Sequence, residues 1–94
     1  MSIDFESIHN HHERAVFEAV AAAAARFPAL QGDVLADVAC VALNRLPARY
    51  IRHEVDLAFY LTEGERANNE QAITDAVKQA FEFVQARNAM RARG

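Results

Sequence analysis

Two prolines, Pro28 and Pro47, constrain the fold of this chain more than any other feature of its sequence. Proline fixes its own φ angle and disfavours a helical conformation in the residue before it, so a helix ends at or before each of them. Between these breaks the chain is rich in alanine and has only three glycines, which favours helix. We therefore expect a mainly α-helical protein with three main helices, the second of which lies between the prolines.

The first helix is expected over residues 4–26, with Ser2 as its N-cap. Apolar side chains and one histidine recur there at three- and four-residue steps, as on one face of a helix: Phe5, Ile8, His12, Val16, Ala19, Val20, Ala23 and Phe27. The second helix is expected over residues 33–46, with Asp33 as its N-cap. This second helix is apolar on almost every side, so it is either central to the fold or shared with a partner subunit.

The last helix is expected to begin after Thr62, because Thr62 and Glu65 have the spacing of a capping box. It is expected to end near Ala89. Its apolar stripe consists of Ile73, Ala76, Val77, Ala80, Phe81 and Val84.

Residues 49–61 differ from the helices, because apolar and polar residues alternate there. Alternation is typical of a short extended segment with one buried face. A strand needs a neighbour for its backbone groups, and we find no second strand in the sequence. The segment therefore folds back as a hairpin, pairs with a second copy of the chain, or is helical. Two features predict a homodimer. The strand has no partner in the sequence, and the second helix is too apolar to be covered by two helices alone.

Length and composition predict a single domain over residues 1–94 that is cytoplasmic. No signal peptide is visible, because Asp4 and Glu6 interrupt the first ten residues, and the alanine tract at 21–25 is too short to span a membrane. The single cysteine, Cys40, excludes an intrachain disulfide and a cysteine-only zinc site. The net charge of -3 makes nucleic acid an improbable partner for the chain as a whole.

Residues 37–50 read DVACVALNRLPARY, and the core of this stretch, Leu-Asn-Arg-Leu-Pro, resembles the signature of the late competence protein ComFB family. Asn10, Glu13, Val16 and Phe17 are similar to the family's pattern in the first helix. The resemblance implies a small homodimeric regulatory protein, and for some members a receptor for cyclic dinucleotides linked to competence, type IV pili or motility. Some relatives carry a zinc-binding cysteine cluster between the first two helices, but residues 27–38 have no cysteine here.

The candidate ligand-binding residues follow the second helix: Asn44, Arg45, Arg49, Tyr50 and Arg52. Guanidinium groups match phosphate oxygens with forked donors, and aromatic rings stack on bases. These residues therefore suit c-di-GMP or c-di-AMP. The alternative is structural: arginines after a helix end are favoured by its dipole, and they have Glu54, Asp56 and Glu63 as surface partners.

Other chemistry has less support in the sequence. His9, His11, His12, His53 and Cys40 match no standard zinc spacing, so a surface or dimer-facing histidine cluster is favoured over a metal site. The glycines form no phosphate loop, and no catalytic triad pattern is present, so we expect no cofactor and no enzyme activity. The alternative to a nucleotide receptor is a ligand-free adaptor that binds an unknown protein partner, using the apolar second helix and the Phe81 and Phe83 pair.

Overall fold

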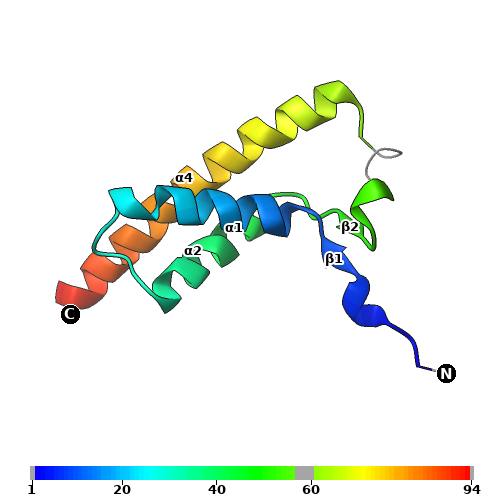
Figure 1. The fold of residues 1–94 in the computed structure, drawn as a ribbon. Helices are drawn as coiled ribbons and strands as arrows, with labels where there is room; N and C mark the ends of the chain where they lie inside the picture. Colours follow the sequence, from blue (N-terminus) through cyan, green and yellow to red (C-terminus); the bar gives the residue numbers. More distant parts are fainter. Residues whose placement is uncertain (1, 57–60, 94) are drawn as a thin grey trace.

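A computed structural model describes residues 2–56 and 61–93 of the chain. Its three α-helices are α1 (His12–Ala23), α2 (Asp33–Asn44) and α4 (Glu63–Arg93), which confirms the mainly α-helical fold. Short 3-10 turns lie at η1 (Phe5–Ser7), η2 (Ala24–Arg26) and η3 (Glu54–Asp56). Figure 1 shows α1 and α2 packed along α4, whose first turns (yellow-green) extend past both.

The hydrophobic core lies where the three helices meet. Phe81 of α4 is fully buried, and its ring stacks on that of Phe27 at a centroid distance of 4.4 Å. Leu30, in the loop between α1 and α2, is also buried and joins this core. The other buried apolar residues of the cluster come from all three helices and the loop after α2: Val16, Val20, Ala23, Val38, Ala39, Ala42, Leu46, Ala76, Val77, Ala80 and Val84.

The start of α1 was predicted wrongly. The helix begins at His12 rather than near Asp4, and Ser2 is not its cap. The Asn10 Oδ1 accepts a hydrogen bond from the His12 N–H, and Glu13 Oε2 accepts one from the Asn10 N–H. These two side chains satisfy backbone donors at the helix start, as in a capping box, and so fix where the helix begins. The residues before it, including Phe5, lie outside the core.

The prediction for α2 was correct at its start and two residues too long at its end. Gly32, not Asp33, occupies the N-cap position, with a φ of 63° that glycine adopts without strain. Asp33 lies in the first turn, where its charge favours the positive end of the helix dipole. Leu46 follows the helix and is buried in the core.

The prediction for α4 is confirmed at its N-terminus. The Thr62 Oγ1 accepts a hydrogen bond from the Glu65 N–H at 3.2 Å, as expected of an N-cap. Five of the six residues of its predicted apolar stripe are buried, and Ile73 is partly buried against them. The helix continues to Arg93, beyond the predicted end near Ala89.

The extended segment expected over residues 49–61 is confirmed only in part. Among its described residues, 49–56 and 61, strand is limited to β2 (Tyr50–Ile51), which pairs antiparallel with β1 (His9–Asn10). The expectation that the sequence holds no second strand was therefore wrong, and the argument for a dimer from an unpaired strand no longer holds. Residues 54–56 form η3, and residues 57–60 of the predicted segment lie outside the described residues.

In the two described stretches, no helix combines the length and the apolar character needed to cross a membrane.

Candidate functional site

A groove of about 740 Å³ runs between α1 and α2 and ends at the segment before β2. The apolar part of its lining comes from both helices: Val20, Ala21, Leu35, Ala36, Ala39 and Leu43. Two aromatic rings border it, because Phe17 and Tyr50 also line the groove and are 50% and 67% exposed. The groove thus offers flat apolar faces to a ligand or a partner.

Two of the five predicted site residues, Asn44 and Tyr50, line this groove together. Asn44 is the last residue of α2, and its Nδ2 donates to the Cys40 carbonyl oxygen at 2.9 Å. That hydrogen bond fixes the side-chain amide against α2. Tyr50 opens β2 and is held by the pairing of β2 with Asn10 of β1. An aromatic ring and an amide therefore lie at the same end of the groove.

The three predicted arginines do not gather in this groove. Arg45 donates to Gln79 Oε1 of α4 at 3.2 Å, and Arg52 donates to Ser7 Oγ of η1 at 3.0 Å. Arg49 lines a different pocket, beside α4. Arg45 and Arg52 are thus directed to two different neighbours, and Arg49 lies in a pocket that includes neither of them. The two described partners, Gln79 and Ser7, are neutral, so they do not cancel the charge of Arg45 or Arg52.

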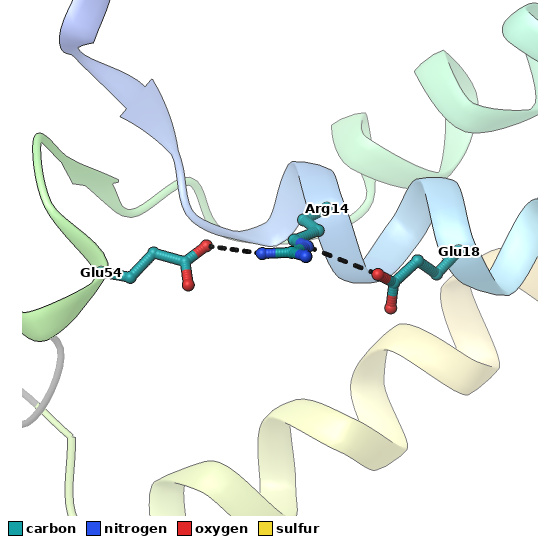
Figure 2. A network of polar contacts seen from close by, with 3 residues as sticks. All are labelled: Arg14, Glu18 and Glu54. Atoms are coloured by element: carbon teal, nitrogen blue, oxygen red, sulfur yellow. Dashed lines mark ion pairs between the residues drawn. The ribbon is translucent and has the colours of Figure 1, made fainter.

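One of the three acidic partners proposed for these arginines, Glu54, pairs with Arg14 instead. Figure 2 shows Arg14 of α1 between Glu18 and Glu54, with nitrogen–oxygen distances of 3.4 and 3.8 Å. All three side chains are well exposed, so these ion pairs contribute little to stability. They do, however, place Glu54 next to α1.

The second pocket, of about 260 Å³, lies between the loop after α2 and the first turns of α4. Its lining is mixed: His12, Arg49, Glu65, Asn68 and Asn69 are polar, and the apolar part comes from Leu46, Pro47, Ala48, Leu61 and Ala72. Sequence reasoning assigned His12 to the apolar stripe of α1 and did not connect it with Arg49. No pattern in the sequence joins them, since their proximity depends on how the loop after α2 returns to the start of α1.

His12 and its neighbour His11 lie in an environment that favours neutral imidazole. Burial, and to a lesser extent the charge of Arg49, lowers the pKa of His12, although a hydrogen bond to the Pro47 backbone opposes this. The pKa of His11 is lowered mainly by burial and, to a lesser extent, by the proximity of His12. The centroids of the His11 and His12 rings lie 4.1 Å apart. His9 belongs to β1, and its Nδ1 contacts the Ser7 carbonyl oxygen. Among the described residues, His, Cys, Asp and Glu form no group of three or more suited to a metal ion.

Sequence reasoning missed three residues that line the groove: Asn10 of β1, and Glu13 and Phe17 of α1. Their three- and four-residue spacing, continued by Val20 and Ala21, was the signal that could have found them. The residues of the α1 core stripe drew attention to the neighbouring side of the helix, which shares Val20 with the groove.

These features define a small three-helix domain with an open groove between two of its helices. The family model described as late competence development protein ComFB matches residues 9–88, so the chain belongs to the ComFB family. This confirms the resemblance seen in the Leu-Asn-Arg-Leu-Pro motif. The chain is therefore a small protein related to late competence. A comparison with curated proteins gives no match.

Proposed function

We propose that the chain is a regulatory protein that binds a cyclic dinucleotide, c-di-GMP or c-di-AMP, in the groove between α1 and α2. The observation that carries this proposal is the joint position of Asn44 and Tyr50 in a groove bordered by Phe17. The volume of this groove, about 740 Å³, is within the range of small-molecule sites. The role is binding rather than catalysis, in the regulation of competence, type IV pili or motility.

Each groove residue has a task in this proposal. The exposed rings of Tyr50 and Phe17 stack on the bases, and stacking of one base on one ring contributes about 1–3 kcal/mol. Asn44 provides an amide for a base edge. The guanidinium groups of Arg45 and Arg49 lie outside the groove. In this proposal Arg45 turns from Gln79, and Arg49 reaches from the second pocket, which shares Ala48 with the groove, so that both bind the phosphates. Arg45 has to release only a neutral partner, Gln79, to do so.

Calorimetric titration with c-di-GMP and with c-di-AMP tests the proposal. We expect binding of at least one of them, and a loss of about tenfold or more for Tyr50→Ala because one stacking face is removed. The matched control is Arg14→Gln, since Arg14 is an exposed arginine of α1 that contacts neither the groove nor the second pocket. No heat with either nucleotide would reject the proposal.

A second candidate is a ligand-free adaptor, favoured by the apolar lining of the groove and by the absence of arginines among its lining residues. An amphipathic helix of a partner protein is the type of segment that binds such a groove. A pull-down that recovers the same partner equally well with and without cyclic dinucleotide favours this candidate. Loss of the partner in Phe17→Glu, with retention in Arg14→Gln, would assign it to the groove.

The homodimer remains part of the proposal. Its support is apolar surface on α4, where Phe83 and Met90 are 49% and 73% exposed. Burying such side chains against a second copy removes apolar area from water. Light scattering is expected to give twice the mass of the chain, and a monomer at all micromolar concentrations would exclude the dimer.

A further inference from the structure

The segment before β1, residues 2–8, forms an arm whose apolar side chains the fold does not bury. Ile3 and Phe5 are 71% and 68% exposed, and neither belongs to the hydrophobic core. They alternate with two acidic residues, Asp4 and Glu6, which are also exposed. Single exposed apolar residues are common on protein surfaces, but neighbouring ones beside charged groups are typical of a surface that binds a partner.

Hydrogen bonds hold the base of the arm away from the three helices. Arg52 Nε donates to Ser7 Oγ at 3.0 Å, and β1 follows the arm directly and pairs with β2. Figure 1 shows the arm (dark blue) running away from the helices at the end where α1 begins. Ala23, at the other end of α1, lies roughly 16 Å beyond His12, because an α-helix rises about 1.5 Å per residue. The arm therefore does not reach the far end of α1 in its own chain.

A third pocket, of about 440 Å³, lies at that far end, between α1 with η2 and α4. Its charged lining residues are two exposed cations, Arg26 and Lys78, and one acid, Glu82. Neither cation has an ion pair within the two described stretches. The apolar part of the lining comes from Ala19, Ala22, Ala23, Phe27, Val77 and Phe81. The third pocket thus combines an apolar floor with an excess of positive charge.

The arm matches the third pocket in both respects, since it is apolar and acidic. The groove between α1 and α2 is a poorer match, because its charged lining residue is Glu13, which repels an acidic arm. We infer that the arm of one copy occupies the third pocket of a second copy. Phe5 then lies on the apolar floor, and the two carboxylates of the arm lie beside Arg26 and Lys78.

Two copies make both contacts at once when they lie antiparallel along α1. Each copy has the arm at one end of α1 and the third pocket at the other. A two-fold axis therefore places each arm at the pocket of the other copy, in an interface that uses the same surface twice. This inference rests on the proposed homodimer and adds the contact that holds it together. It does not depend on nucleotide binding.

The first test removes the apolar contact. Phe5→Ala is expected to raise the dissociation constant of the dimer about a hundredfold or more, because two phenylalanine side chains lose their burial in each dimer. The variant is expected to fold, since Phe5 is outside the core. Val55→Ala is the control, because Val55 is 70% exposed and lies in η3, away from the arm and the third pocket. Sedimentation equilibrium measures the constants. An equally tight dimer in Phe5→Ala would overturn the inference, leave the homodimer intact and assign the pocket to another occupant.

The second test reverses charges on the two sides of the contact. The arm variant combines Asp4→Lys with Glu6→Lys, and the pocket variant combines Arg26→Glu with Lys78→Glu. Each variant alone brings like charges together, so it is expected to dimerise at least about tenfold more weakly. An equimolar mixture pairs each arm with a pocket of opposite charge and is expected to restore the dimer. A mixture that stays as dissociated as either variant alone would overturn the inference.

The control for charge reverses two exposed cations outside the third pocket, Arg14→Glu with Arg91→Glu. It is expected to dimerise as the unmodified chain does, and a loss equal to that of the pocket variant would mean that only the net charge matters. A monomeric unmodified chain would overturn the homodimer and the arm contact together. Calorimetry with c-di-GMP judges the nucleotide proposal separately, because the arm is outside the groove.

Discussion

Asn10 Oδ1 accepts a hydrogen bond from the backbone N–H of Arg49 at 3.2 Å, across 39 positions of the chain. The same oxygen accepts from the His12 N–H, also at 3.2 Å, and Asn10 is 8% exposed. One buried amide oxygen therefore joins the start of α1 to the segment that carries Arg49 and Tyr50. The positions of the groove and of the second pocket both depend on this connection.

Replacing this amide is expected to destabilise the fold. Asn10→Ala leaves two backbone N–H groups without their acceptor, which lowers the free energy of unfolding by about 1–3 kcal/mol. Asn10→Asp is the matched control, because its carboxylate keeps an acceptor at the helix start and suits the helix dipole. Chemical denaturation measures both variants. If Asn10→Ala is as stable as the unmodified chain, the Asn10 side chain does not hold these elements together.

Two phenylalanines of α4 are expected to differ in how much they stabilise the fold. Phe81 is fully buried and stacks on Phe27, whereas Phe83 is 49% exposed. Phe81→Ala removes buried area and leaves a cavity, so it is expected to lower the free energy of unfolding by about 3–5 kcal/mol. Phe83→Ala is the control and is expected to cost much less. Similar losses for the two variants in thermal unfolding would show that Phe83 is covered in solution, as in the proposed dimer.

The two adjacent histidines predict loss of stability in acid. Burial lowers the pKa of His12 and of His11 below 6.5 in the folded protein, and the unfolded chain keeps the ordinary value. The unfolded state therefore binds more protons once the pH falls to that value. The free energy of unfolding therefore has its full value above pH 6.5. It declines as the pH falls below 6.5, by at most about 1.4 kcal/mol per pH unit for each histidine.

Melting temperatures measured across this pH range check the prediction. His12→Gln is expected to reduce the dependence on pH, since it removes the more buried of the two groups. His53→Gln is the control, because His53 is exposed and follows β2 in the chain, whereas His11 and His12 precede it. A melting temperature that does not change between neutral and mildly acidic pH contradicts the assignment of these rings as neutral.

Sequence reasoning predicted α4 well because its information is local. The Thr62 cap and the apolar stripe through Phe81 each depend on residues within a few turns of one another. It failed at the start of α1, although Asn10 and Glu13 have the spacing of a capping box, because the apolar stripe from Phe5 suggested a longer helix. The exposure of Phe5 shows that periodicity alone does not bury a residue.

The candidate site was predicted only in part for a related reason. Asn44 and Tyr50 share a groove because α2 ends where the loop to β2 begins, and both features follow from nearby residues. The mate of β2 is a two-residue strand at His9–Asn10, which is too short to show alternation. The directions of Arg45 and Arg52 depend on α4 and η1, which are distant in sequence, so no local pattern encodes them.

The charge of Glu65 gives the last prediction. Its side chain lines the second pocket with Arg49, and its backbone N–H is the group that Thr62 caps. Glu65→Gln keeps the helix cap and removes a negative charge that repels a phosphate, so c-di-GMP is expected to bind up to about fivefold more tightly. Glu63→Gln is the matched control, since Glu63 lies in the same first turn and does not line the pocket. Titrations at low and high salt measure the effect, which is expected to shrink as salt screens the charges. Equal gains for the two variants would mean that only the net charge matters and that the phosphate does not lie near Glu65.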